Sequence, residues 1–368
     1  MSSQQKTRVL LVVVVCFLVF FGGRSLLIAK DARKHEGRED GGLGLGKALE
    51  ATKSSIKTTG ATGVCAQSSE AIRSFVQGNI SCGEVCSYAE NVKKQGKFFP
   101  QLRKQVDCIN ILGRLMTYQP AKQWPPPEEI PKELYNSFTI DGKCPVVQKW
   151  YFKQKYSGGE AMVNKWSREY VQGFMENRKK KIAIGNYGMD GDNCVQFGLE
   201  SVRDQVVGKV GLVVGSETPW VEAISLVVGA KEVHTLEYGY ISVGHPQLAA
   251  FLPPQFALRM LKEGPQYDFV VSYSSLEHSG LGRYGDAINP FGDLEAMAQV
   301  WCSLKPGGIA IIAVPVKTFG TWKDCGFAWN AHRYYGLERF KHLWANFEIL
   351  SASCEHSDQP VIVGRKLE

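Results

Sequence analysis

Short apolar runs alternate with helix-length segments through the second half of the chain. The runs are residues 210–214, 233–236, 269–272, 309–314, 347–350 and 361–363. Strand-length runs separated by room for a crossover helix are typical of a parallel sheet. The last two runs lie about ten residues apart, too close for a helical crossover, so we expect them to pair antiparallel. The pattern therefore predicts an α/β fold with a mostly parallel sheet, helices on both faces and a C-terminal antiparallel strand.

A different periodicity precedes these strands, between residues 159 and 181. Apolar side chains recur there at steps of three and four, which places them on one face of a helix. They are Met162, Val163, Trp166, Tyr170, Val171, Phe174 and Met175. We interpret them as core residues of a helix rather than as a ligand site.

The N-terminus carries an uncharged apolar run, residues 9–21, after Lys6 and Arg8. Extended to Ala29, the run reaches roughly the twenty residues that a membrane-spanning helix needs. A cleaved signal peptide has the same basic start and apolar centre, but no clear cleavage site follows. We predict that residues 1–29 form a signal anchor, with a cleaved signal as the alternative.

The orientation of this anchor depends on opposing signals. Five Lys or Arg residues between 24 and 38 favour a cytosolic body by the positive-inside rule. The sequon Asn79-Ile80-Ser81 and the cysteines favour an oxidising compartment instead. We predict a single-pass type II membrane protein of the endoplasmic reticulum or Golgi, with a luminal body glycosylated at Asn79.

Composition divides the remaining chain. Residues 30–63 are rich in Gly, Lys, Ser and Thr, which predicts a flexible stem. Residues 64–141 are expected to form a small helical, cysteine-containing subdomain, and residues 142–368 the α/β domain. Five cysteines fall between 65 and 144 without a paired metal-ligand spacing, so we predict disulfides and no metal site. The oligomeric state stays open.

The charge of the chain excludes one class of partner. The net charge is +7, but residues 1–60 hold ten Lys/Arg against five Asp/Glu and supply +5 of it. The body is nearly neutral, whereas a surface that follows nucleic-acid phosphates needs clustered cations. We therefore expect no nucleic-acid partner.

Candidate ligand contacts follow the first two strands of the predicted sheet. The first strand leads into Gly215, Ser216 and Glu217, with Thr218 suited to cap the next helix and Pro219 to begin it. Glu237 directly follows the second strand, where an acid can accept both hydroxyls of a ribose. In open α/β sheets, ligands bind at these carboxyl ends of strands.

The third long strand, 269–272, ends in small polar residues followed by Glu277 and His278, and Leu304-Lys305-Pro306-Gly307-Gly308 precedes the next strand. In both features the chain resembles the class I S-adenosylmethionine-dependent methyltransferases, which have a Rossmann-like fold. The string Leu276-Glu277-His278-Ser279-Gly280-Leu281-Gly282-Arg283-Tyr284-Gly285-Asp286 more closely resembles a nematode-rich family with a conserved domain of unknown function. This resemblance covers roughly residues 140–366.

The resemblance implies S-adenosylmethionine as the cofactor. It implies cofactor contacts at Gly215, Ser216, Glu217, Glu237, Ser274 and Ser275. The usual first motif holds further glycines and an acid two residues before the first of them, where this chain has Val213. These departures leave two alternatives open, a cofactor held differently or a fold that has lost it.

The acceptor side of the site follows from the residues after the third long strand. A methyl transfer to oxygen needs a base near the acceptor hydroxyl, and His278 titrates near neutrality when unperturbed. We expect His278 and Asp286 to be catalytic, with a structural brace of Glu277 and His278 as the alternative. Arg283, Tyr284 and His332 are expected to contact the substrate.

These features predict a membrane-anchored methyltransferase that acts on a glycan or another small hydroxylated acceptor. A catalytically inactive binding or scaffold protein on the same fold is the first alternative. An enzyme using a nucleotide-sugar or a dinucleotide is the second, although the turn after the first predicted strand lacks G-x-G-x-x-G.

Overall fold

The structure is a computed structural model that describes residues 106, 108–116, 126–149, 164–316, 325–354 and 357–367. All of them belong to one compact unit, residues 61–368. The expected anchor, the stem and the sequon at Asn79 lie outside the described residues. Within the described part of the chain, every helix is too short or too polar to cross a membrane.

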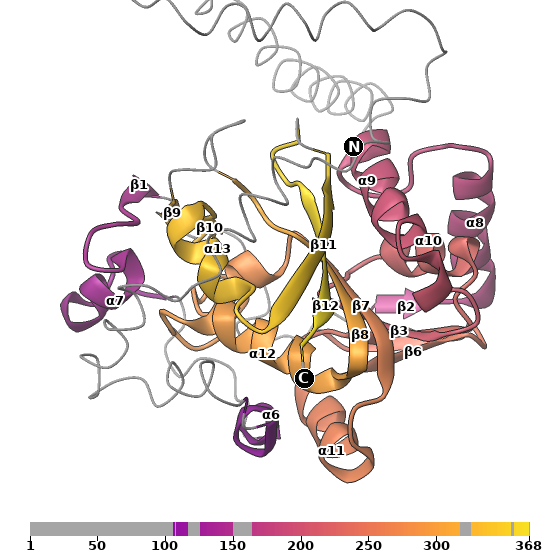
Figure 1. The fold of residues 1–368 in the computed structure, drawn as a ribbon, viewed down its shortest axis with the longest axis horizontal. Coiled ribbons are helices and arrows are strands. Elements are labelled where there is room, and N and C mark those ends of the chain that lie inside the picture. The colour runs from indigo at the N-terminus through magenta and orange to yellow at the C-terminus, as the bar shows by residue number, and fades with distance from the viewer. Residues whose placement is uncertain are drawn as a thin grey trace, which may run out of the picture. The chain divides into compact units, whose positions relative to one another are not determined.

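A seven-stranded sheet forms the centre of the described fold (Figure 1), in the order β11-β12-β8-β7-β3-β4-β6. Its strands are β3 (Val210–Val214), β4 (Glu232–Leu236), β6 (Leu248–Phe251), β7 (Tyr267–Tyr273), β8 (Leu304–Ala313), β11 (Phe347–Ser353) and β12 (Val361–Lys366). Neighbours from β8 to β6 are parallel, and β12 is antiparallel to both β8 and β11. The α/β fold and the antiparallel pairing of the last two strands are confirmed.

The sheet separates two apolar cores because successive side chains of a strand point to opposite faces. Along β8, Ile309 and Ile311 enter one core, while Ala310 and Ile312 enter the other. The first core lies under α8 (Arg168–Lys179), α9 (Gly188–Glu200) and α10 (Trp220–Val228), which Figure 1 shows together on one side. The second lies under α6 (Cys108–Met116), α11 (Pro253–Glu263), α12 (Gly292–Ser303) and α13 (Leu337–Leu343).

The remaining elements are short. Strands β1 (Val146–Lys149), β9 (Gly326–Trp329) and β10 (His332–Tyr334) form one small sheet, and β2 (Asn164–Trp166) pairs with β5 (Ile241–Val243). Helix α7 (Tyr135–Thr139) and the 3₁₀ turns η1 (Lys132–Leu134), η2 (Arg203–Gln205) and η3 (Leu276–His278) connect the larger elements.

Two local predictions need correction. The helix expected between 159 and 181 begins only at Arg168, because Ser167 caps it by accepting the Tyr170 N–H at 3.1 Å. Trp166 lies in strand β2 instead, and Met162 and Val163 lie outside the described residues. Strand β6 was not among the predicted strands, because its two central residues are alanines, which favour strands less than β-branched or aromatic residues do.

Three disulfides join distant parts of the described chain: Cys108–Cys302, Cys144–Cys325 and Cys194–Cys354. The first links α6 to α12, with 5.5 Å between the two Cα atoms. Cys108 and Cys144 are the described members of the predicted cysteine cluster, and both are bonded to cysteines of the α/β region.

Candidate functional site

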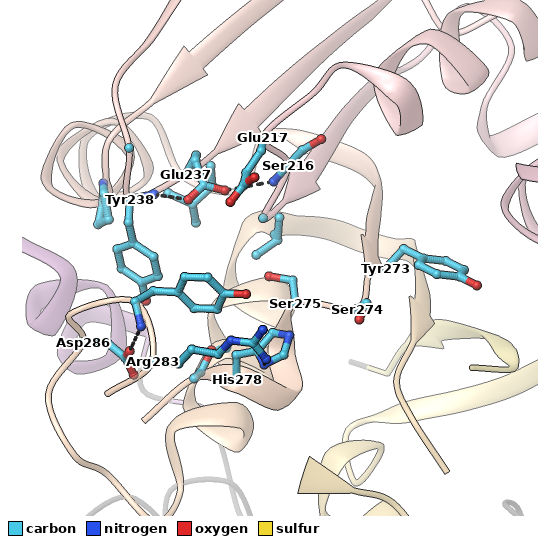
Figure 2. Close-up of a pocket in the computed structure, with 18 of the residues that line it drawn as sticks. Ser216, Glu217, Glu237, Tyr238, Tyr273, Ser274, Ser275, His278, Arg283 and Asp286 are labelled. Carbon is cyan, nitrogen blue, oxygen red and sulfur yellow. Dashed lines mark hydrogen bonds between the residues drawn. The ribbon is translucent and has the colours of Figure 1, made fainter. Parts of the chain in front are cut away.

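A cleft of about 360 Å³ opens at the carboxyl ends of β3, β4 and β7 (Figure 2). The strand order reverses between β3 and β7, and ligands of open α/β sheets bind at such a point. The cleft has the size of a small-molecule site. Ten of the predicted site residues line it: Gly215, Ser216, Glu217, Glu237, Ser274, Ser275, His278, Arg283, Tyr284 and Asp286.

The turn after β3 brings its backbone close to the loop after β7. Gly215 has φ of +76°, in the left-handed region, and a Cβ there would overlap the side chain of Ser275. Glycine is therefore required both by the backbone conformation and by the close approach of the second loop. The expected cap at Thr218 is wrong, because α10 begins at Trp220 with Pro219 in the capping position and no side-chain cap.

Glu237 is held against this turn by backbone N–H groups. Its carboxylate accepts the Ser216 N–H at 2.9 Å and the Tyr238 N–H at 2.7 Å. Burial raises the pKa of Glu237, the Tyr238 N–H opposes this rise, and the nearby Glu217 adds to it. A carboxylate has about four lone-pair sites, and the N–H groups of Ser216, Tyr238 and Gly239 do not fill them, so Glu237 can still accept from a hydroxyl group in the cleft.

A second, fully buried acid supports the turn from behind. The Ser216 hydroxyl lies 2.8 Å from the carbonyl of Thr218 and 3.1 Å from the carboxyl of Glu222. Ser216 can donate its one hydrogen to either acceptor, the Thr218 carbonyl or the Glu222 carboxylate. Burial raises the pKa of Glu222 to about 7, and hydrogen bonds from Thr235 and Ser216 oppose this rise.

Asp286 shapes the loop that carries two predicted substrate contacts. One of its oxygens accepts the N–H groups of Gly280 at 2.6 Å and Gly282 at 3.4 Å, and the other accepts that of Tyr284 at 3.2 Å. These bonds hold Arg283 and Tyr284 on the cleft. The geometry assigns Asp286 a loop-shaping role, and its expected catalytic role stays a prediction.

His278 lines the cleft, but both ring nitrogens face protein atoms. Its Nδ1 lies 2.6 Å from the carbonyl of Ala331, which can only accept, so this nitrogen carries the hydrogen. Its Nε2 lies 3.5 Å from Oε1 of Glu277. Burial lowers the pKa of His278 to about 3, and Arg283 lowers it further. The ring is therefore neutral at physiological pH and has no hydrogen on Nε2 to donate to Glu277, so the brace of Glu277 and His278 stays a prediction.

His332 does not line the cleft. It lies behind His278, with 6.1 Å between the ring centroids, and burial lowers its pKa to about 4. The geometry of the cleft does not test the predicted substrate contact of His332, which stays a prediction. Within the ranges that the structure describes, no three His, Cys, Asp or Glu side chains are grouped so that they could hold a metal ion.

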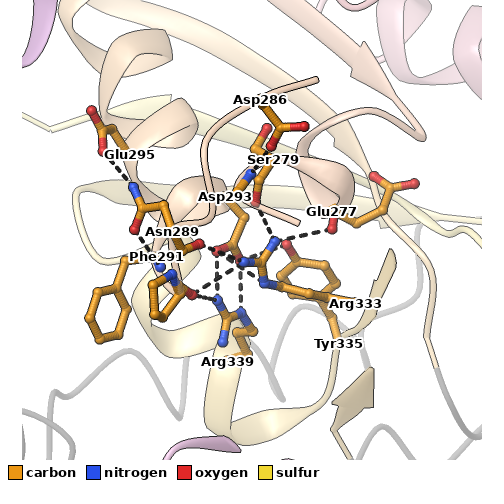
Figure 3. A network of polar contacts seen from close by, with 12 residues as sticks. Glu277, Ser279, Asp286, Asn289, Phe291, Asp293, Glu295, Arg333, Tyr335 and Arg339 are labelled. Atoms are coloured by element: carbon orange, nitrogen blue, oxygen red, sulfur yellow. Dashed lines mark hydrogen bonds and ion pairs between the residues drawn. The ribbon is translucent and has the colours of Figure 1, made fainter. Parts of the chain in front are cut away.

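A buried ionic network holds the loop between η3 and α12 (Figure 3). Arg333 donates to the carbonyl oxygens of Glu277, Ser279, Asn289 and Pro290 at 2.6–3.2 Å. Arg339 forms two hydrogen bonds of 2.6 and 2.7 Å with Asp293, which also accepts the Tyr335 hydroxyl at 2.7 Å. Burial opposes ionisation of Asp293, but the two arginines hold its pKa at about 2. The network thus positions the backbone of the loop that carries the cleft residues.

Sequence reasoning missed the aromatic wall of the cleft. Tyr187, Trp220 and Tyr273 line it, with ring centroids 4.8–6.1 Å apart. Tyr238 lines it too, and its position directly after Glu237 was a usable signal. Tyr187 had no such signal, because a loop before α9 brings it to the cleft.

Residues 208–367 match the family DUF268. Its description reads "Caenorhabditis protein of unknown function", and this match confirms the family resemblance predicted from the string 276–286. The DUF268 region contains β3 to β12, and with them ten of the predicted residues on the cleft. No curated protein matches the sequence.

Solved structures similar to this chain include S-adenosylmethionine-dependent methyltransferases. One is a 1,6-didemethyltoxoflavin-N1-methyltransferase of Burkholderia thailandensis with bound S-adenosylhomocysteine. It is 14% identical to this chain with a TM-score of 0.36, and the match covers 54% of this chain and 86% of that chain. Another is described as a putative sarcosine dimethylglycine methyltransferase of Galdieria sulphuraria: identity 13%, TM-score 0.34, covering 48% and 85%.

Proposed function

We propose that this protein is an S-adenosylmethionine-dependent methyltransferase that acts on a hydroxylated acceptor. The observation that carries the proposal is the contact between the Gly215 turn and Glu237. These residues come from the ends of two adjacent parallel strands, and the 2.9 Å bond from the Ser216 N–H fixes an acid at the rim of the cleft. This is where an α/β sheet recognises a ribose.

The residues of the cleft fit the proposed cofactor. Glu237 would hold the ribose hydroxyls, and Tyr238 and Pro253 would flank the flat base. Val213 is buried in the core and cannot supply the missing acid, but Glu217 lines the cleft and would take the ammonium group. Burial raises the pKa of Glu217, and Arg283 opposes the rise. S-adenosylmethionine, when bound, supplies an electrophilic methyl group.

The acceptor is a hydroxylated molecule, and we favour a glycan. The wall of Tyr187, Trp220 and Tyr273 suits packing against a sugar ring, because aromatic faces combine apolar area with defined geometry. Arg283 and Tyr284 offer polar groups on the opposite loop.

The compartment is the secretory pathway, with residues 1–29 as the anchor and the body in the lumen. The three disulfides of the described residues support this, because disulfides persist in oxidising compartments. Endoglycosidase treatment should increase the gel mobility of the expressed chain, and Asn79→Gln should abolish that change. Protease digestion of the body in sealed microsomes would exclude a luminal body.

Calorimetric titration of the full chain with S-adenosylmethionine and S-adenosylhomocysteine tests the proposed function. Binding of both ligands, together with transfer of labelled methyl groups to glycans released from secreted glycoproteins, is the expected result. Binding without transfer to these or other hydroxylated acceptors would favour an inactive binding protein, which the single glycine of the turn also suggests. Failure to bind, with binding of a nucleotide-sugar or NAD instead, would overturn the proposal.

A further inference from the structure

Glu277 is a fully buried carboxyl group with one unused oxygen. Its side chain is 0% exposed, and its Oε1 accepts the Ser274 hydroxyl at 2.7 Å. Its Oε2 is buried and has no hydrogen-bond partner among the residues that the structure describes. An unpaired buried carboxylate oxygen costs free energy and needs an explanation. A carboxyl group that accepts a proton during a reaction would explain the unpaired oxygen, because such a group needs a free acceptor position.

Ser274 connects this carboxyl group to the cleft. The serine lines the cleft at the end of β7, as Figure 2 shows, and has φ of +53°. Its hydroxyl donates its only hydrogen to Glu277, and one of its lone pairs accepts the Gln359 N–H at 3.0 Å. The second lone pair accepts the hydroxyl of Tyr187, which also lines the cleft.

Other groups at this end of the cleft are less suited to take a proton. The Nδ1 of His278 carries a hydrogen bonded to a backbone carbonyl, and its Nε2 faces Glu277 rather than the cleft. The oxygens of Asp286 are occupied by N–H groups of its own loop. Burial raises the pKa of Glu277 to about 7, which is the range in which a base works at neutral pH.

We propose that Glu277 accepts the proton of the reaction and that Tyr187 and Ser274 pass it on from the acceptor hydroxyl. This inference rests on the proposed methyltransferase function. The acceptor oxygen forms a bond to the methyl carbon as the methyl–sulfur bond breaks, and that electron pair returns to sulfur. The acceptor O–H proton moves to the Tyr187 hydroxyl, the hydrogen of Tyr187 moves to Ser274 Oγ, and the hydrogen of Ser274 moves to Glu277. The products are a methyl ether, a neutral thioether and a protonated Glu277.

The charges around Glu277 set the expected pH dependence. His278, Arg283 and Arg333 face it, and the two arginines oppose the rise of its pKa. Tyr187 and Tyr273 also face it, and Tyr187 hydrogen-bonds with Ser274. The tyrosines are neutral near pH 7, because burial raises their pKa values. Only ionised Glu277 can accept, so turnover should rise with pH through about 7.

Glu277→Gln tests this role, because glutamine keeps the shape and the bond from Ser274 but cannot accept a proton. We expect turnover on released glycans to fall by about 10²–10⁴-fold with unchanged affinity for S-adenosylhomocysteine. Ser274→Ala should also lower turnover, and Glu348→Gln, the same change on the exposed face of β11, should not. Undiminished turnover of Glu277→Gln, or a pH profile that is flat around 7 in the parent protein, would overturn the proposal.

Infrared difference spectroscopy gives a readout that needs no acceptor. Carboxylic acid carbonyl bands of Glu277 and Glu222 should appear in the full chain as the pH falls through about 7, and the Glu277 band should be absent in Glu277→Gln while the Glu222 band remains. Ser274→Ala should move the titration of Glu277 to higher pH, because the carboxylate loses a hydrogen bond. A missing Glu277 band overturns the role of Glu277, whereas failure to bind S-adenosylhomocysteine overturns the methyltransferase function itself.

Discussion

Glu237→Ala should weaken binding of S-adenosylhomocysteine by roughly ten- to hundredfold. The proposed contact joins a carboxylate to ribose hydroxyls, and hydrogen bonds to a charged group contribute about 1.5–3 kcal/mol. A tenfold change in affinity corresponds to about 1.4 kcal/mol, so the lost contact gives the stated range. The substitution should also lower the stability of the fold, because Glu237 holds the turn after β3.

The loss of stability follows from the backbone N–H groups of Ser216 and Tyr238, which both donate to Glu237. The N–H of Ser216 belongs to a buried residue and would be left without its acceptor, at a cost of about 1–3 kcal/mol. The N–H of Tyr238 belongs to a residue that is 39% exposed, so water replaces the carboxylate there. We therefore expect the free energy of unfolding to fall by about 1–3 kcal/mol while the domain stays folded at 25 °C.

Calorimetry at 25 °C and thermal unfolding of the full chain measure the two effects separately. Glu232→Gln is the matched control, since Glu232 is a half-exposed acid at the opposite end of the same strand. It should leave the affinity unchanged. A Glu237→Ala protein that binds S-adenosylhomocysteine as tightly as the parent would refute ribose recognition by Glu237. Lower stability with full affinity would reduce Glu237 to a structural support of the turn.

Three further substitutions test other parts of the site. Gly215→Ala should lower the free energy of unfolding by about 1–3 kcal/mol and weaken binding of S-adenosylhomocysteine, because φ is +76° and a Cβ has no room. A variant that melts and binds like the parent would contradict this. Asp293→Asn should cost about 3–5 kcal/mol, because Arg333 and Arg339 lose their buried counter-ion. The pKa of Asp293 in the folded protein, about 2, lies below the usual value of 3.8, so its stabilisation is present above pH 4 and is lost as the pH falls towards 2; acid unfolding curves should show this loss only in the parent. His278→Ala should lower stability by about 1 kcal/mol or more and reduce activity only with the folded fraction; a roughly 10²-fold loss of turnover at intact stability would instead make His278 the base.

The sequence by itself determined the central sheet. A buried strand is a continuous run of apolar residues of strand length, so the strands at 210–214 and 361–363 could be predicted without coordinates. The approach of Gly215 to Glu237 was also accessible, because the end of one parallel strand lies beside the end of the next. The alanines of β6 carried no such signal, since their partial burial depends on neighbouring elements.

Only the tertiary structure decided what each polar side chain does at the cleft. Glu277 and His278 are adjacent in the sequence, yet the first is left with an unpaired oxygen, and the second is bonded to a carbonyl 53 residues away. Arg333 holds the backbone of Glu277 across 56 residues. Periodicity reports which face of an element is buried. Hydrogen-bond partners and pKa values depend on desolvation and charge supplied by distant segments, which become neighbours only when the chain has folded.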